Sequence, residues 1–322
     1  MKAIISESYG SPDTLKLSEV DTPTPKQNQV LVRVHASSIN FGNLVLLTGK
    51  PLLARLVFGL RKPKYPIPGG DMAGIVEAIG ENVTQFQVGD EVYGDLSSSG
   101  WGAYAEHVAV DEKALVLKPS NLSFTEAAAV PMAATTALQA IRDKGMVRAG
   151  QEVLIIGASG GVGTFAVQIA KAFGAEVTAV VSTRNVDIVR SFGSDHVIDY
   201  KKEDFTNHNQ TYDLILGVNG GQSISTYKRK LKGNGVFIHI GGKESQMYQT
   251  MTLGSWYSLI GKKKFSTFLQ RANPKDLVFM KELIEEGKVK PVIDRSYSLS
   301  EVPKAFQYFE EGHSQGKVII TI

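Results

Sequence analysis

The sequence predicts an α/β protein in which a doubly wound parallel sheet is inserted into a mainly β, partly barrel-like domain. Between residues 124 and 265, strand patterns alternate with helical patterns, which is typical of a parallel sheet. The preceding residues form short β-branched or alternating runs that Gly and Pro interrupt, and the C-terminal residues return to that style. We therefore expect two domains, residues 1–123 with 266–322 and residues 124–265.

The outer domain is expected to contain strands at residues 30–34, 74–79, 90–93 and 104–110. Ser123 and Glu126 have the spacing of a capping box, so a helix is expected to begin after Ser123. The C-terminal part adds two amphipathic helices and a closing strand, at residues 275–286, 301–311 and 316–321.

The inserted domain is expected to contain five strands, at residues 152–156, 176–181, 196–198, 213–218 and 236–240. Helical patterns at 164–173 and 185–192 lie between the first three strands, and each ends at a glycine, as helices often do.

Composition excludes several classes of protein. The formal net charge is only +3 over 322 residues, and the one dense basic run, residues 262–264, is interpreted as a solvated loop, so we expect no nucleic-acid partner. Cysteine is absent, which excludes disulfides and thiolate metal sites. No signal peptide and no run of about 18 apolar residues is found, so we expect a cytoplasmic protein without a membrane partner.

The most informative motif is a glycine-rich turn that follows an apolar strand and opens a helix. It contains Gly157, Gly160, Gly161 and Gly163. Glycines let the chain turn sharply and let a ligand approach the backbone, while the amides at the helix N-terminus attract phosphate charge. The motif predicts a site for the pyrophosphate of a dinucleotide.

The end of the second strand of this domain indicates which dinucleotide binds. An acidic residue there would accept hydrogen bonds from the adenine ribose of NAD, but this chain has Ser182, Thr183, Arg184 and Asn185. Hydroxyls and a guanidinium can instead bind a 2′-phosphate. We therefore expect NADPH rather than NADH as the cofactor.

The same turn also satisfies the Gly-x-Ser-x-Gly motif of α/β-hydrolases, through Gly157, Ser159 and Gly161. A serine esterase is thus a remote alternative. An esterase would not explain Gly160, Gly163 or the basic turn after the second strand.

Four blocks of sequence, in order along the chain, resemble the medium-chain dehydrogenase/reductase superfamily, specifically its zinc-free NADPH quinone oxidoreductase branch. They are Ile39-Asn-Phe-Gly-Asn43 with Thr48-Gly49, residues 66–74 through 89–92, the glycine turn, and residues 287–292 with 312–317. The resemblance implies a Rossmann domain inserted in a GroES-like catalytic domain.

The resemblance also implies that no catalytic metal is bound. Zinc-dependent relatives place a cysteine ligand where this chain has Asn40, and a Gly-His-Glu motif where it has Gly69, Gly70 and Asp71. Gly70 has no side chain to bind a metal, and the cysteines of a structural zinc lobe are also missing.

Carried over residue by residue, the resemblance implies a set of cofactor contacts in addition to the 2′-phosphate pair Ser182 and Arg184. Tyr200 is implied near the adenine ribose, Thr136 near the nicotinamide, and Lys317 within reach of the cofactor. The pyrophosphate turn and the ribose and nicotinamide shelf contribute Ser159, Gly160, Gly161, Val162, Val218, Asn219, Gly241 and Gly242. Asn40 is the one candidate catalytic residue, as a hydrogen-bond donor to a developing oxyanion.

These features predict an NADPH-dependent, metal-free hydride transfer to quinones or α,β-unsaturated carbonyls. Enoyl-thioester reduction, zinc-free alcohol oxidation and a non-catalytic NADPH-binding sensor or structural protein stay open, because one fold hosts many functions. A homodimer is expected, since such folds commonly pair through the edge of the parallel sheet. Residues 52–62 are an apolar and basic insertion, which is either a lid or an amphipathic surface helix.

Overall fold

The computed structural model describes residues 1–322, and the chain divides into two compact units. The first unit comprises Met1–Thr135, Arg271–Glu286 and Pro291–Ile322, and the second comprises Thr136–Gln270 with Gly287–Lys290. The first division falls after Thr135, within helix α4 (Pro131–Leu138), rather than after residue 123. The second unit thus interrupts the first in sequence.

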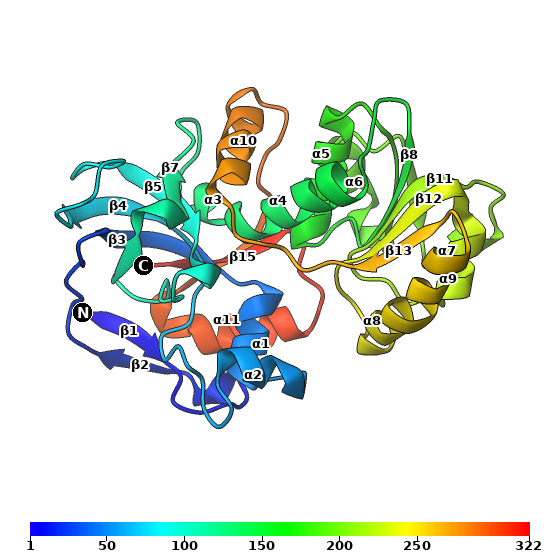
Figure 1. The fold of residues 1–322 in the computed structure, drawn as a ribbon. Coiled ribbons are helices and arrows are strands. Elements are labelled where there is room, and N and C mark those ends of the chain that lie inside the picture. The colour runs from blue at the N-terminus through cyan, green and yellow to red at the C-terminus, as the bar shows by residue number, and fades with distance from the viewer. The chain divides into compact units, whose positions relative to one another are not determined.

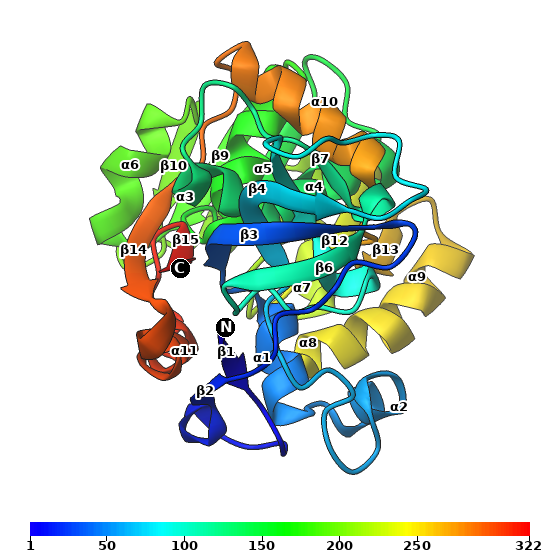
Figure 2. The same ribbon diagram turned by 90° about the vertical axis from the view of Figure 1, so that its left-hand side faces the viewer.

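The first unit is built on a seven-stranded sheet with the order β14-β15-β3-β4-β5-β7, in which β6 also pairs with β3. β3 and β4 are antiparallel and bulged, and Figure 2 shows β3, β4 and β6 side by side. The C-terminal strand β15 pairs with β3, which returns the end of the chain to the N-terminal unit. The strands are β3 (Gln29–Ser38), β4 (Asp71–Ile79), β5 (Glu91–Asp95), β6 (His107–Asp111), β7 (Leu115–Leu117), β14 (Ile293–Ser298) and β15 (Lys317–Thr321).

Short helices and one hairpin complete this unit. The hairpin joins β1 (Lys2–Ile5) to β2 (Lys16–Glu19). The capping box is confirmed, because the Ser123 N–H donates to Glu126 at 2.9 Å and α3 begins at the next residue. The helices are α1 (Phe41–Thr48), α2 (Arg55–Phe58), α3 (Phe124–Ala128), α10 (Pro274–Glu285) and α11 (Val302–Glu310).

The second unit is a six-stranded parallel sheet with the order β10-β9-β8-β11-β12-β13. This doubly wound order leaves a crevice where the strand order reverses, between β8 and β11. Figure 1 shows α5 and α6 on one face of the sheet and α7 and α9 on the other. The strands are β8 (Glu152–Ile156), β9 (Glu176–Val181), β10 (His196–Asp199), β11 (Tyr212–Gly217), β12 (Leu231–His239) and β13 (Lys264–Thr267). The helices are α5 (Gly161–Ala172), α6 (Val186–Ser191), α7 (Ile224–Lys230), α8 (Glu244–Gln249) and α9 (Ser255–Ile260).

The predicted fold class is confirmed, and one local interpretation is wrong. The basic run 262–264 is not simply a solvated loop, because Lys264 begins β13 and Lys263 is anchored. The Lys263 ammonium donates to the carbonyls of Lys228 at 2.7 Å and Leu231 at 2.6 Å. β13 has only four residues, and Phe265 is its one buried apolar side chain. So short a segment shows no clear alternation of apolar and polar residues in the sequence.

No single helix of the structure is long and apolar enough to cross a membrane. One bent pair, Phe41–Thr48 with Leu52–Phe58, passes the test of length and composition only when the two are taken together, and it bends by 84° between them.

Candidate functional site

Two glycines of the predicted turn are required by the protein itself. Gly157 has a φ of 84°, and a Cβ there would lie 2.9 Å from the backbone nitrogen of Asn219. A Cβ on Gly163 would lie 2.7 Å from Cα of Ala158 and would overlap the carbonyl oxygen of Gly157. These glycines let α5 start directly against the end of β8.

Gly160 is different, because nothing in the protein requires a glycine there. Its backbone is extended (φ −81°), and the nearest atom to a Cβ would be the Gly157 carbonyl oxygen at an ordinary 3.7 Å. Gly160 is the N-cap of the twelve-residue helix α5, whose first amides have no partner within the helix. The open space beside these amides fits a pyrophosphate that approaches the backbone.

Asn185 joins the glycine turn to the end of the second strand. Its Nδ2 donates to Oγ of Ser159 at 2.7 Å and to Oγ of Ser182 at 3.3 Å. The two predicted serines are therefore brought together, and Arg184 is exposed on the same 3₁₀ turn. The sequence placed Asn185 in this turn without a role, because only the fold shows that its amide spans the two strand ends.

This contact also bears on the esterase alternative. A nucleophilic serine needs a base within hydrogen-bond reach, usually a histidine. Oγ of Ser159 instead accepts from the amide of Asn185, which cannot take a proton. The geometry of Ser159 therefore suits a ligand contact, not nucleophilic attack.

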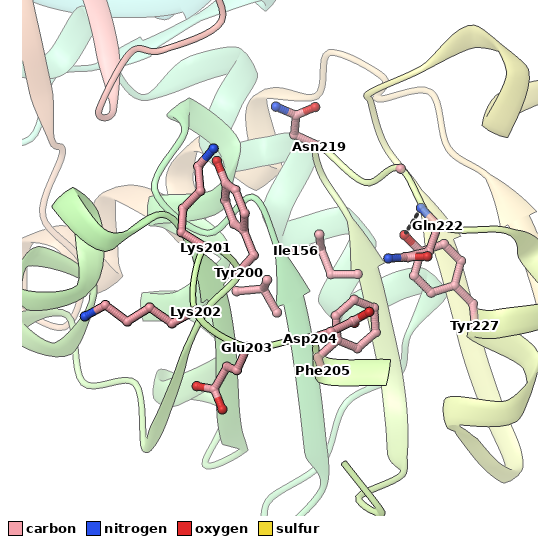
Figure 3. Close-up of a pocket in the computed structure, with 12 residues that line it drawn as sticks. Ile156, Tyr200, Lys201, Lys202, Glu203, Asp204, Phe205, Asn219, Gln222 and Tyr227 are labelled. Carbon is pink, nitrogen blue, oxygen red and sulfur yellow. Dashed lines mark hydrogen bonds between the residues drawn. The ribbon is translucent and has the colours of Figure 1, made fainter. Parts of the chain in front are cut away.

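A cavity of about 480 Å³ lies beside the carboxyl ends of the parallel strands, as Figure 3 shows. It extends from Tyr200, at the end of β10, to Tyr227 on α7, and Ile156 lies between them. Tyr200 and Asn219, two of the predicted cofactor contacts, line it, and their contact with a cofactor stays a prediction. The lining residues are Ile156, Val180, Tyr200, Lys201, Lys202, Glu203, Asp204, Phe205, Asn219, Gly221, Gln222 and Tyr227.

Lys201 is a cation at this cavity that no sequence motif indicated. Its ammonium lies 5.4 Å from the centre of the Tyr200 ring, and Figure 3 shows both side chains pointing to the same edge of the cavity. Lys202 points away and lies 3.7 Å from Oδ2 of Asp199. The sequence offered two adjacent lysines, and only the structure distinguishes them.

The predicted ribose and nicotinamide shelf is formed by backbone after β11 and β12. The N–H groups of Val218 and Asn219 both donate to the Ile156 carbonyl, at 3.0 and 3.1 Å. The Gly241 N–H donates to the Gly217 carbonyl at 3.2 Å, and a Cβ on Gly241 would lie 2.8 Å from the Val218 carbonyl oxygen. Gly242 forms a bridge with Gly220. The two strand ends therefore pack backbone to backbone.

Thr136, predicted on the nicotinamide side, is the first residue of the second unit and is buried in α4. Its role toward a cofactor stays a prediction.

The first unit contains a buried polar cluster around Asp71, which is fully buried at the start of β4. Its Oδ2 accepts from Nδ2 of Asn40 and from Oγ of Ser38, each at 2.7 Å, and its Oδ1 accepts from the backbone N–H of Met132 at 2.9 Å. The ammonium of Lys317 lies 3.6 Å from Oδ2 of Asp71.

Lys317 also holds Asn40 directly. Its Nζ donates to Oδ1 of Asn40 and, at 3.1 Å, to the Ile39 carbonyl. Burial lowers the pKa of Lys317, and the Asp71 carboxylate opposes that shift. The structure thus gives Lys317 contacts within the first unit, and its prediction as a cofactor contact stays a prediction.

These contacts leave one N–H of the Asn40 side-chain amide without a partner in the cluster. An amide nitrogen carries two N–H donors, and only one of them is used by Asp71. The backbone N–H of Asn40 donates to Oδ1 of Asn43 at 2.8 Å, which fixes the residue at the start of α1. No group of three or more His, Cys, Asp or Glu side chains in the structure could hold a metal ion.

Comparison with known proteins agrees with this architecture. Residues 26–120 match the family described as alcohol dehydrogenase GroES-like domain, and residues 192–320 match the family described as zinc-binding dehydrogenase. A 2-methylene-furan-3-one reductase of Solanum lycopersicum is 35% identical over 99% of this chain and 79% of its own length. The chloroplastic NADPH-dependent alkenal/one oxidoreductase of Arabidopsis thaliana is 34% identical with the same coverage.

Among solved structures, the quinone oxidoreductase from Coxiella burnetii superposes with a TM-score of 0.88 at 30% identity, covering 100% of this chain and 99% of its own. The fold, the glycine turn and these relatives agree. The chain therefore belongs to the medium-chain dehydrogenase/reductase superfamily of NAD(P)H-dependent oxidoreductases, in its zinc-free quinone oxidoreductase branch.

Proposed function

We propose that this chain reduces quinones or α,β-unsaturated carbonyls with NADPH and without a metal. The observation that carries the proposal is the cofactor site of the second unit. There, Gly160 at the N-terminus of α5 is open, and the preceding Ser159 is tied by Asn185 to the end of β9. The four residues directly after β9, 182–185, contain no acid. The names of the relatives supply the substrate classes: 2-methylene-furan-3-one, alkenal/one and quinone.

The choice of NADPH rests on cations and hydroxyls at the adenine end of the site. Arg184 and Lys201 follow β9 and β10, and Ser182 presents a hydroxyl that Asn185 holds. A 2′-phosphate would gain charge-assisted hydrogen bonds from these groups, and no acid directly after β9 repels it. Among the relatives, the alkenal/one oxidoreductase is named as NADPH-dependent.

In the proposed mechanism, the bound nicotinamide supplies the hydride. The amides at the start of α5 would hold the pyrophosphate, and the shelf after β11 and β12 would orient the rest of the cofactor. Asn40 donates its spare Nδ2–H to the oxygen on which charge develops, and Lys317 and Asp71 fix the orientation of that amide. Solvent is the proposed proton source.

A panel of acceptors tests this proposal. Oxidation of NADPH would be followed without oxygen against simple quinones, enals, enones and an enoyl thioester, with NADH as the control cofactor. Reduction of a simple ketone with NADPH, and oxidation of the corresponding alcohol with NADP⁺, test the alcohol dehydrogenase alternative. We expect turnover with quinones or with enals and enones, and we expect it to be faster with NADPH than with NADH. Tight NADPH binding without turnover of any acceptor would instead favour a sensor or structural role.

We further propose that the chain is a homodimer that pairs through β13. This strand is the last of the parallel sheet and is hydrogen-bonded only to β12. Apolar side chains beside it are exposed, among them Trp256 at 56% and Leu259 at 84%. Burying such groups against a second copy would stabilise a dimer. Analytical ultracentrifugation should show a dimer that Leu259→Asp weakens.

A further inference from the structure

Residues 50–64 carry an apolar face that the proposed reaction does not use. Five large apolar side chains of this segment are each 68% to 71% exposed: Leu52, Leu53, Leu56, Val57 and Leu60. Leu52 and Leu53 lie on a 3₁₀ turn, Leu56 and Val57 lie on α2, and Leu60 follows α2, which projects below α1 in Figures 1 and 2. Single exposed leucines are ordinary, but five within nine residues form a patch.

Specific contacts fix the direction of this face. The Arg55 guanidinium donates to the Gly49 carbonyl at 3.2 Å and lies 4.6 Å from the centre of the Tyr9 ring. The Tyr9 hydroxyl donates to the Gly59 carbonyl at 2.5 Å. Phe58 packs edge-on against Trp101, with the ring centres 6.0 Å apart. The arginine and phenylalanine of α2 therefore turn inward, and its aliphatic side chains are left facing solvent.

The charge around this face is mainly positive. The sequence contains no Asp or Glu between Asp21 and Asp71, while Lys50, Arg61, Lys62 and Lys64 are exposed beside the leucines. The backbone hydrogen bond from Ser6 to Pro66 brings one acid, Glu7, to this side of the unit. Aliphatic side chains next to several bases form a surface that is complementary to anionic lipids.

We propose that residues 50–64 are a docking surface for an anionic lipid bilayer. The aliphatic side chains enter the boundary between headgroups and acyl chains, and the four bases contact lipid phosphates. The segment lies on the membrane and does not cross it, because its helices are far shorter than the roughly 20 residues that a span requires. This proposal replaces the expectation from the sequence that the chain has no membrane partner.

The same observations disfavour two other occupants. A second copy related by two-fold symmetry would place these bases against the same bases, without an acid in the segment to pair with them. A lid over a substrate would turn its apolar side chains inward, whereas here Phe58 alone among the large apolar residues of α2 does so. A bilayer requires neither pairing nor closure.

Flotation of the full-length protein with vesicles tests the proposal. The vesicles contain phosphatidylcholine alone or phosphatidylcholine with roughly one-third phosphatidylserine. We expect at least tenfold more protein on the anionic vesicles, with less binding at high salt. The double variants L56S/V57S and R61E/K62E should each lower that binding at least tenfold. V88S, which changes an apolar residue that is 61% exposed elsewhere in the unit, should leave it unchanged.

Thermal melts establish that each variant is folded, and the turnover of a water-soluble quinone without vesicles should stay at the wild-type level. The proposal fails if wild-type protein does not float with anionic vesicles, or if both double variants float as well as the wild type. It also fails if L56S/V57S converts a dimer to a monomer, which would identify a second copy as the occupant. A raised KM for the soluble quinone in the same variant would identify a lid.

Discussion

Nδ2 of Asn40 donates a 2.7 Å hydrogen bond to Oδ2 of Asp71, while Oδ1 of the same amide accepts from Lys317. The amide lies between a buried carboxylate and a buried ammonium, so each charge orients one end of it. Position 40 is where zinc-dependent relatives place a cysteine ligand. In this chain, the two charges there fix the neutral amide of Asn40 in a definite direction.

Removing the ammonium should destabilise the first unit. In Lys317→Met, the Asp71 carboxylate stays buried without its counter-charge, and breaking such a pair costs about 3–5 kcal/mol. Urea unfolding should show this loss, and the double variant with Asp71→Asn should recover part of it. A double variant that is no more stable than Lys317→Met would show that the two side chains do not depend on each other.

Loss of the Asn40 amide should lower turnover more than substrate binding. If Asn40 donates to the developing oxyanion, Asn40→Ala should reduce kcat about 100-fold with little change in KM. Steady-state kinetics and an unfolding curve separate this effect from misfolding. Full turnover with an unchanged KM in a folded variant would remove Asn40 from the catalytic step.

Two glycines of the same turn should behave in opposite ways. Gly163→Ala would force a methyl group onto the backbone of the turn, and overpacking of this kind costs about 1–3 kcal/mol of stability. Gly160→Ala meets no protein atom closer than 3.7 Å, so its melting temperature should be unchanged. Its NADPH affinity, measured by quenching of NADPH fluorescence, should nevertheless fall. An unchanged affinity in Gly160→Ala would place the pyrophosphate elsewhere.

Substitutions of the adjacent lysines should have different effects, because only Lys201 is proposed to contact NADPH. A charge-assisted hydrogen bond contributes about 1.5–3 kcal/mol, so Lys201→Ala should weaken NADPH binding about 10- to 100-fold. Affinity for NADH, which has no 2′-phosphate, should stay the same. Arg184→Ala should act in the same direction as Lys201→Ala.

Lys202→Ala is the matched control for this pair. It removes the same charge from the neighbouring residue, whose side chain points away from Lys201 and Tyr200, and should leave the NADPH/NADH ratio unchanged. If Lys202→Ala changes that ratio and Lys201→Ala does not, the assignment of the two lysines is reversed.

Acid should remove one specific contribution to stability. Hydrogen bonds from Lys281 and from the Ser120 backbone lower the pKa of Glu285 from its usual value near 4.3 to about 2. Because the folded-state pKa is the lower one, the stabilisation is present in full above the unfolded pKa. It is lost as pH falls through the folded value.

Glu285→Gln tests this dependence. The variant should be less stable than the wild type near neutral pH, and the difference in unfolding free energy should shrink as pH falls below about 4.3. Urea curves over the range in which both proteins are folded measure it. A difference that does not vary with pH would mean that the carboxylate charge contributes nothing.

The sequence predicted the regular parts of this protein well, because local patterns decide them. The apolar run before Gly157 predicted β8 with its exact bounds. The pattern of the residues after the turn predicted α5, but the helix begins at Gly161, three residues earlier than expected. The capping box at Ser123 was visible because both of its partners lie within four residues. β13 was missed, because a four-residue strand has no pattern of its own and forms by pairing with β12.

The site was predicted where a motif carries the chemistry and missed where tertiary contacts create it. Gly160, Ser182 and Tyr200 follow strand ends, so their neighbourhood could be inferred from a parallel sheet. The contact of Asn185 with Ser159 joins residues 26 positions apart. The choice between Lys201 and Lys202 depends on the direction in which one loop turns.

By itself, the sequence determined the class of the fold, the place of the glycine turn and the absence of thiolate chemistry, because each depends on residue type and short spacing. The tertiary structure decided which polar groups meet. Lys317 and Asn40, separated by 277 residues, come together because β15 pairs with the end of β3 and the next residues carry their side chains into one buried cluster. The outward direction of the leucines on α2 was decided in the same way, by Arg55, Phe58 and their distant partners. Such contacts are set by packing between elements, and no local pattern records them.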